Sequence, residues 1–171
     1  MRDFGTFIFV TGGAYQGKLD YALSLCVPHP VAVIEGDAIP ETWFLSSCEP
    51  SCLSELVAIS LASTKEKMGE EEADDVVPCA IIVNHVERMA RTIRTLSMAP
   101  EEAFENLLSK FNRLTRISQL ILIADEVGSG VVPLGKESRL DREYAGRIAV
   151  NCASKASKVV RVLAGIPLII K

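Results

Sequence analysis

Histidine, tryptophan and long apolar runs are scarce in this chain of 171 residues. It has two histidines, His29 and His85, and one tryptophan. No apolar run reaches the ~18 residues that a membrane-spanning helix needs, so no membrane partner is expected. The N-terminal apolar stretch is short and has no small-residue cleavage site, which predicts a cytoplasmic protein without a signal peptide. The net charge of −4 gives no excess of positive charge for binding nucleic acid.

The cysteines form no recognised metal-binding pattern. Cys48 and Cys52 lie four residues apart, but no second pair of Cys or His residues at ligand spacing accompanies them. Reduced, mostly buried thiols are therefore expected, with a zinc site as the alternative. The length and the 49% share of hydrophobic residues suit a single domain over residues 1–171 with one core.

Short apolar runs alternate along the chain with segments that suit helices. Buried strands are predicted at 6–11, 31–34, 79–83 and 119–124, and short closing strands at 159–165 and 167–171. Helices are predicted at 17–26, 53–68, 85–96, from Pro100 to Leu114, and at 138–156. The acidic run at 69–75 suits a solvated loop, with a cation or partner site as the alternative. This alternation predicts an α/β fold of three layers, with a mostly parallel sheet between helices.

A glycine-rich segment lies directly between the first predicted strand and the first predicted helix. Residues 12–18, "GGAYQGK", have the spacing G-x-x-x-x-G-K. Glycines allow successive N–H groups to point at one anion, beside the positive end of the helix dipole. Lys18 adds a charge for the β- and γ-phosphates. We therefore predict a phosphate-binding loop in which Lys18 is catalytic; the alternative is a chance glycine turn.

The residue after Lys18 departs from this motif. A Ser or Thr hydroxyl at that position normally binds Mg²⁺, which offsets charge during phosphoryl transfer. Leu19 has no oxygen to offer. Asp20 follows, but one residue along a helix turns the side chain by about 100°, so its carboxylate need not reach the same ion. The sequence thus predicts phosphate binding with an altered metal site.

Both ends of the chain resemble one enzyme family. The segments that carry the resemblance are "VTGGAYQGK" (10–18), "DEVGSGVVP" (125–133), Arg139, "REYAGR" (142–147) and "VLAGIPLIIK" (162–171). They resemble the bifunctional adenosylcobinamide kinase/adenosylcobinamide-phosphate guanylyltransferase family of cobalamin biosynthesis. The resemblance implies a P-loop NTPase fold of the RecA-like type, and transferase activity as a kinase and nucleotidyltransferase. It also implies GTP or ATP with Mg²⁺, a corrinoid substrate and a homotrimer.

The middle of the chain departs from the family pattern. In the family, a histidine that accepts the guanylyl group lies between the second strand and a P-x-x-W step. Here "PETW" (40–43) keeps that step, but only residues 35–39 precede it, and none is histidine. Guanylyl-histidine chemistry is therefore predicted to be absent. His85, after the third strand, is interpreted as a structural histidine, with a substitute for the missing group as the alternative.

A carboxylate also changes place relative to the family. The third strand ends in Asn84, where the family has an acidic residue that helps to hold the metal. The fourth strand ends in Asp125, where the family has Asn or a similar small polar residue. We hypothesise that the carboxylate has moved from position 84 to Asp125, predicted to be catalytic and metal-binding; the alternative is a turn cap. This hypothesis expects the third and fourth strands to flank the loop-bearing strand.

The predicted nucleotide-binding residues lie in the glycine loop and at strand ends. They are Gly12, Gly13, Ala14, Tyr15, Gln16, Gly17, Lys18, Leu19, Glu35, Gly36, Asp37, Asn84, Glu126 and Arg139. Arg139 and Arg142 are expected to pair either with phosphates or with Glu137 and Asp141 on their own helix. Three functions stay open: an enzyme that acts on a corrinoid, a non-catalytic nucleotide-binding sensor or scaffold, and a scaffold that binds no nucleotide.

Overall fold

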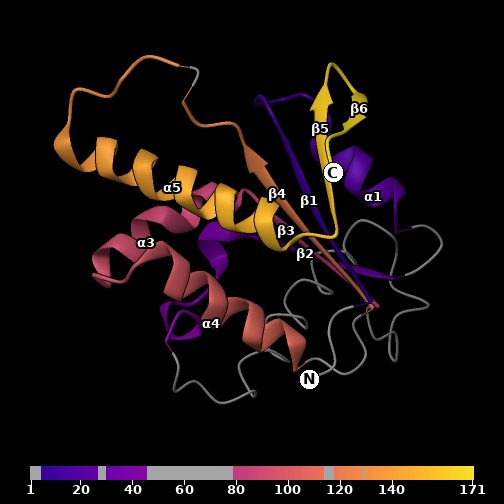
Figure 1. Ribbon diagram of the computed structural model, residues 1–171, viewed down its shortest axis with the longest axis horizontal. Coiled ribbons are helices and arrows are strands. Elements are labelled where there is room, and N and C mark those ends of the chain that lie inside the picture. Colours follow the sequence, from indigo (N-terminus) through magenta and orange to yellow (C-terminus); the bar gives the residue numbers. More distant parts are fainter. Residues whose placement is uncertain (1–4, 27–29, 46–78, 114–117, 129) are drawn as a thin grey trace, which may run out of the picture.

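Six strands form one sheet in the computed structural model, which describes residues 5–26, 30–45, 79–113, 118–128 and 130–171. The strands are β1 (Thr6–Gly12), β2 (Val31–Glu35), β3 (Ala80–Asn84), β4 (Gln119–Asp125), β5 (Lys158–Leu163) and β6 (Ile166–Ile169). Their order across the sheet is β2-β3-β4-β1-β5-β6. The first five run parallel, and β6 returns antiparallel to β5 (Figure 1). The predicted strands are thus confirmed, including the C-terminal pair.

The helices follow the predicted positions, although some are shorter. The α-helices are α1 (Lys18–Ser24), α3 (Met89–Thr95), α4 (Pro100–Asn112) and α5 (Lys136–Lys155). Single 3₁₀ turns are η1 (Gly36–Ala38), η2 (Glu41–Trp43) and η3 (Val86–Arg88). Pro100 begins α4, where a missing N–H costs no helical hydrogen bond. The helix predicted at 53–68, the acidic run at 69–75 and Leu114 lie outside the described residues.

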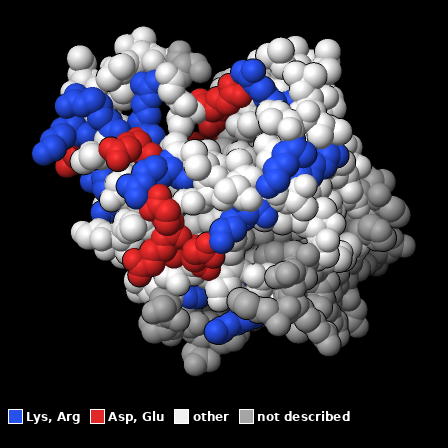
Figure 2. All heavy atoms as spheres, viewed as in Figure 1, with Lys and Arg blue, Asp and Glu red and all other residues white. Residues whose placement is uncertain are grey.

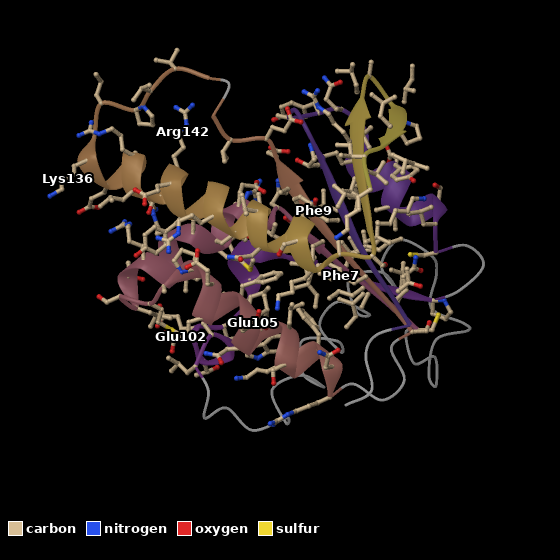
Figure 3. All side chains as sticks on the ribbon, viewed as in Figure 1. Phe7, Phe9, Glu102, Glu105, Lys136 and Arg142 are labelled. Carbon is tan, nitrogen blue, oxygen red and sulfur yellow. The ribbon has the colours of Figure 1, made fainter. Side chains whose placement is uncertain are left out.

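Alternate residues of β1 to β5 enter two different cores. Phe7 and Phe9 of β1 pack in the core beneath α3, α4 and α5 (Figures 1 and 3). Ile8 and Val10 point to the opposite face, where they pack with Ala22 of α1. Because strands buried on both faces need apolar residues at every position, these runs are continuous rather than alternating. The predicted three-layer α/β fold is confirmed. With the glycine loop between β1 and α1, and with β4 and β5 on either side of β1, it is a P-loop fold of the RecA-like type.

The neighbours of β1 differ in part from the prediction. β1 pairs with β4 on one side and with β5 on the other, so β3 lies one strand further away. The expectation that the third strand flanks the loop-bearing strand is therefore wrong, while the fourth strand does flank it. The apolar pattern of a strand identifies it as buried but does not specify its partners. At ~4.8 Å between neighbours, β3 runs about 10 Å from β1.

Charged side chains of both signs are mixed on the helical layer. Figure 2 shows basic and acidic side chains close together over this face. Arg147 of α5 lies 2.6 Å from Glu101 of α4, and Lys155 of α5 lies 2.6 Å from Glu105. Such exposed pairs each contribute little to stability, but they keep both signs of charge interspersed along α4 and α5.

Two of the cysteines lie in the core as free thiols, as predicted. Cys26 and Cys152 are buried, and burial raises the pKa of the Cys152 thiol. Cys48 and Cys52 lie outside the described residues. Among the helices that the structure describes, none is both long and apolar enough to cross a membrane.

Candidate functional site

The glycine loop joins the carboxyl end of β1 to the first turn of α1. Gly12 has φ 151°, and a Cβ atom at this position would lie 2.3 Å from the carbonyl oxygen of Val162 on β5. Gly17 has φ 80° and is the last residue before α1. Tyr15, between them, also has positive φ and is fully exposed. The loop therefore depends on glycine at Gly12 because of close approach, and at Gly17 because of backbone conformation.

The turn between β5 and β6 supports the loop from the side. The Gly165 N–H donates a hydrogen bond of 3.1 Å to the carbonyl oxygen of Gln16. The Ala164 N–H donates another to the Gln16 side-chain oxygen. Both residues of this turn have positive φ, which is typical of a tight two-residue hairpin. The backbone of the loop is thus fixed by a segment distant in sequence.

Lys18 is buried and points back into the loop. Its side chain is 6% exposed, and Nζ donates a hydrogen bond of 2.6 Å to the carbonyl oxygen of Gly13. The same Nζ lies 2.6 Å from Oδ1 of Asp125. Asp125 reaches it because β4 pairs with β1 in a register that sets Asp125 opposite Gly12. A buried cation held under a glycine loop is placed to attract an anion.

His85 and Glu87 extend this group of charges across the sheet edge. His85 Nδ1 lies 3.0 Å from Oε1 of Glu87 and 3.9 Å from Oδ2 of Asp125. Oε2 of Glu87 accepts a hydrogen bond of 3.0 Å from the Asp125 N–H. These three side chains form a compact set of potential metal ligands. We define the catalytic-edge cluster as Lys18, His85, Glu87 and Asp125.

The positions at which the family pattern expects metal ligands do not supply them here. Leu19 packs against the apolar core under α1. Asn84 is buried, and its Nδ2 donates a hydrogen bond of 2.9 Å to Oε1 of Glu35. Arg88 lies 3.7 Å from a carboxylate oxygen of Glu35 and 3.7 Å from one of Asp37. The usual Mg²⁺ ligand set therefore does not fit this chain.

Three of the predicted nucleotide-binding residues lie far from the loop. Glu35 ends β2, and Gly36 and Asp37 begin η1 directly after it. Two strands separate β2 from β1, so this corner is about 14 Å from the loop-bearing strand. Gly36 lies against η3, where a Cβ atom would come within 2.3 Å of the His85 carbonyl oxygen. These three residues therefore lie at the same edge of the sheet as the loop but outside its immediate surroundings.

Glu126 makes an exposed ion pair beside the loop. It follows Asp125, and its carboxylate binds the Arg161 guanidinium through two hydrogen bonds of 2.6 and 2.9 Å. The hydrogen bond and then the charge of Glu126 raise the pKa of Arg161. Its own N–H donates to the carbonyl oxygen of Gly12. Glu126 thus holds β4, β1 and β5 together at the mouth of the loop.

The arginines of α5 bind the backbone of the preceding loop. Arg139 donates hydrogen bonds to the carbonyl oxygens of Pro133 and Leu134. Arg142 donates to those of Gly130 and Val131, and its side chain points toward that loop (Figure 3). The alternative in which they pair with acidic residues of their own helix is wrong, because those acidic residues face α3. Glu137 and Asp141 both lie beside Arg94 of α3.

A shallow groove of about 370 Å³ lies between this loop and α5. It is lined by Val127, Gly128, Val132, Pro133, Arg139, Arg142, Glu143 and Gly146. Val132 is exposed beside it, as are Val131 and Leu134. The groove begins one residue after Glu126, so it opens from the same edge of the sheet as the glycine loop.

Sequence analysis did not single out Glu87. The interpretation of His85 as a structural histidine is compatible with its contact with Glu87, but His85 also lies near Asp125. The available signal was the spacing His85-x-Glu87 directly after a buried strand. Carboxyl ends of parallel strands meet at one edge, so both residues were candidates to join Asp125 there.

A model of the family described as cobinamide kinase / cobinamide phosphate guanyltransferase matches residues 52–170. This segment contains His85, Glu87 and Asp125, and it begins after the glycine loop. A comparison with curated protein sequences gives no match.

Two solved structures are similar over nearly the whole chain. One is flagellar accessory protein FlaH from Methanocaldococcus jannaschii, with 14% identity and a TM-score of 0.45, covering 99% of this chain and 79% of that one. The other is PH0250 from Pyrococcus horikoshii OT3, with 9% identity and a TM-score of 0.47, covering 99% of this chain and 88% of that one.

Proposed function

Because the chain belongs to the cobinamide kinase / cobinamide phosphate guanyltransferase family, we propose that it transfers a phosphoryl group from GTP or ATP to a corrinoid. The observation that carries this proposal is the buried Lys18 inside a glycine loop, at the end of β1 and the start of α1. In the reaction, an acceptor hydroxyl oxygen forms a bond to the γ-phosphorus while the bond to the β-phosphate oxygen breaks. The products are a nucleoside diphosphate, a phosphate ester and a proton released to solvent.

The residues of the loop supply positioning and charge in this proposal. The loop backbone and the start of α1 face the phosphates, and Lys18 neutralises charge on the β- and γ-phosphates. Its contact with the Gly13 carbonyl is exchanged for phosphate oxygens when a nucleotide binds. Asp125 holds the ammonium at the loop through the contact of 2.6 Å. Phosphoryl transfer depends mainly on such positioning and electrostatic stabilisation, so these groups are the minimum it requires.

We propose the kinase reaction ahead of guanylyl transfer. The chain has no histidine in the interval between β2 and Trp43, where the family carries its guanylyl acceptor. His85 lies on a different strand end, with its Nδ1 beside Glu87. His29 lies outside the described residues. A covalent guanylyl intermediate would therefore require a different acceptor from that of the family.

A second candidate function is nucleotide binding without catalysis. It is favoured by Leu19 and Asn84, since one packs in the core and the other bonds to Glu35. A sensor or scaffold of this kind would bind GTP or ATP with little dependence on metal and would form no product. It uses the same loop and the same Lys18, so the two functions differ in turnover rather than in binding site.

Calorimetric titration of the purified chain with GTP and with ATP, each with and without Mg²⁺, tests the proposal. We expect one nucleotide per chain to bind. Lys18→Met removes the ammonium and keeps an unbranched apolar side chain, so it should weaken binding by about 100-fold or more. Lys110→Met is the matched control, because Lys110 is also 6% exposed but bonds to the Leu45 carbonyl oxygen away from the loop.

The outcomes separate the candidates. Equal nucleotide affinity in the Lys18 variant and the Lys110 variant would contradict the phosphate-loop assignment. Binding that depends on Lys18, followed by phosphorylation of added cobinamide, supports the kinase. Binding that depends on Lys18 with no phosphorylated product from either nucleotide supports the sensor or scaffold.

We also propose that the chain forms a homo-oligomer, a trimer as in the family resemblance, through its C-terminal hairpin. Every residue of β6 is exposed, and Leu163, Ile166, Leu168, Ile169 and Ile170 present large apolar side chains. An exposed apolar edge strand is a surface that proteins normally cover. Sedimentation of the whole chain should give three times the mass of one chain. Ile169→Lys should reduce that mass, and a single-chain mass in the unchanged protein would refute the proposal.

A further inference from the structure

We propose that His85, Glu87 and Asp125 form a site for a divalent metal ion that accepts an imidazole ligand, such as Mn²⁺ or Zn²⁺. Each residue offers one ligand atom, and these atoms lie within 4.8 Å of one another. Nδ1 of His85 faces Oε1 of Glu87 and Oδ2 of Asp125. The site itself stands on this geometry alone. Its use for holding a bound nucleotide rests on the proposed function.

The spacing of the three ligand atoms suits one face of a coordination polyhedron. Metal–ligand bonds of about 2.1 Å place adjacent ligands roughly 3.0 Å apart in an octahedron and roughly 3.4 Å apart in a tetrahedron. Nδ1 of His85 lies 3.0 Å from Glu87 Oε1 and 3.9 Å from Asp125 Oδ2. A side-chain rotation that brings Asp125 Oδ2 slightly closer completes the face. The remaining positions of the metal stay open for water or phosphate oxygens.

Each ligand is held by a second contact that leaves its metal-binding atom available. The Asp125 N–H binds Oε2 of Glu87, so Oε1 faces the imidazole. Lys18 lies against Oδ1 of Asp125, so Oδ2 faces His85. His85 directly precedes η3 in the left-handed conformation, with its carbonyl oxygen closely packed against Gly36. Such outer contacts orient metal ligands and are typical of built metal sites.

The charges of the catalytic-edge cluster also favour a divalent cation. Two carboxylates and one ammonium give the cluster a formal charge of −1 when the imidazole is neutral. A bound divalent ion reverses this to +1, which then attracts a polyphosphate. Lys18 shares Asp125 with the metal, so it competes with the metal for that carboxylate while both face the same phosphates.

The donor set selects the type of metal. Mg²⁺ prefers oxygen ligands and usually keeps several waters, whereas an imidazole with carboxylates suits transition-metal ions. Its ligands come from the segment that follows β3 and from the end of β4. The site would therefore hold a metal near the phosphates, which Leu19 and Asn84 do not do.

Metal binding to the full chain without nucleotide provides the test. Mn²⁺ is titrated and the free ion is counted by electron paramagnetic resonance, with Mg²⁺ as competitor. We expect one Mn²⁺ per chain, resistant to competition by equimolar Mg²⁺, with a pulsed-resonance signal from a directly bound nitrogen. His85→Gln should abolish the nitrogen signal and weaken Mn²⁺ binding by about tenfold or more. His29→Gln is the matched control, because it leaves His85 as the one histidine.

Two further variants keep the test decisive. Glu87→Gln should weaken Mn²⁺ binding while the nitrogen signal of the residual bound ion persists, which a fold defect would not produce. Lys18→Met should strengthen Mn²⁺ binding, because it removes the competing ammonium from Asp125. Unchanged Mn²⁺ affinity in His85→Gln, absence of the nitrogen signal from the unchanged chain, or no bound Mn²⁺ would each overturn the site.

The test is separate from that of the proposed function. Metal binding is measured without nucleotide, so an intact metal site with no nucleotide binding overturns only the kinase and sensor proposals. Nucleotide binding that depends on Lys18, in a chain that binds no Mn²⁺, overturns only the metal site.

Discussion

Two polar corners lie on the same edge of this sheet, and they have the same formal charge but different surroundings. The catalytic-edge cluster combines Lys18 with two carboxylates. The second corner, which we call the β2 corner, consists of Glu35, Asp37, Asn84 and Arg88. Arg88 is 48% exposed, whereas Lys18 is 6% exposed. Both corners contain two carboxylates and one cation. Water screens these charges in the β2 corner, whereas those of the catalytic-edge cluster lie in a lower dielectric.

The hydrogen bonds of the two corners differ as well. In the β2 corner, the Asn84 amide donates to Oε1 of Glu35. Oε2 of Glu35 has no hydrogen-bond partner among the described residues and lies 3.7 Å from Arg88, which also lies 3.7 Å from Asp37. In the catalytic-edge cluster, Glu87 and Asp125 each direct one oxygen toward the imidazole of His85. The β2 corner is closed by its amide and guanidinium contacts, whereas the catalytic-edge cluster adds an imidazole to its two carboxylates. Burial and the set of potential ligand atoms, rather than charge, identify the candidate site.

The largest effect is expected when a Cβ atom is added at a glycine that packs against a backbone carbonyl oxygen, as Gly12 and Gly36 do. Gly12→Ala places a Cβ 2.3 Å from the Val162 carbonyl oxygen in a backbone conformation that alanine disfavours, so the free energy of unfolding should fall by about 3 kcal/mol. Gly36→Ala meets the His85 carbonyl at the same distance without positive φ, so about 2 kcal/mol is expected. Urea unfolding measures both. A larger loss of stability for Gly36→Ala than for Gly12→Ala would mean that the backbone around Gly12 adjusts more readily than the backbone around Gly36.

The next effect concerns the carboxylate that faces Lys18. Asp125→Asn leaves the buried ammonium without its counter-charge and should lower the free energy of unfolding by about 2 kcal/mol, since Asp125 keeps some contact with water. The same change should remove any gain in nucleotide affinity from added Mn²⁺ while it spares metal-free binding. Calorimetry with and without Mn²⁺ measures this. An identical metal dependence in both proteins would show that Asp125 only caps the following turn.

The smallest effect tests whether the β2 corner can regain a metal. Asn84→Asp sets a second carboxylate beside Glu35, in place of a hydrogen bond of 2.9 Å. Repulsion raises the folded-state pKa of this pair above its unfolded value. The variant should therefore be less stable by about 1 kcal/mol near pH 8, and the deficit should shrink below about pH 5 as one carboxyl takes up a proton.

Mg²⁺ binding by this variant is the complementary measurement. No gain in Mg²⁺ affinity is expected, because the side chain at position 84 faces Glu35 rather than the loop. Mg²⁺ binding together with unchanged stability would contradict the closed character of the β2 corner. It would also indicate that an acidic residue at position 84 can bind the metal, as the family pattern implies.

The sequence predicted the elements and the glycine loop well, because their signals are local. The apolar run at 6–11, the glycines after it and Lys18 gave the strand, the loop and the helix start in order. Pro100 gave the first residue of α4. These features depend on residues within a few positions of one another, and such patterns are readable from the chain itself.

The partners of these elements could not be predicted in the same way. β1 lies between β4 and β5, not beside β3, because strand pairing is decided by packing across the whole sheet. The contact between Lys18 and Asp125 follows from the pairing of β1 with β4, and the approach of His85 to Asp125 follows from the pairing of β3 with β4. His85 has a left-handed backbone conformation, which the sequence around it does not indicate. Lys18 and Asp125 were therefore predicted as single site residues, whereas Glu87 and the cluster as a whole were not.

The hydrogen bonds between Gln16 and the turn at Ala164 and Gly165 have a consequence for the order of folding. They join segments almost 150 positions apart, so the loop gains its final shape only after the last two strands have paired. Contacts of such long range form late, because the intervening chain must first give up its freedom. During synthesis, a chain whose residues near 165 are still inside the ribosome has the glycine loop without its support. Nucleotide binding would then report that this chain has finished folding.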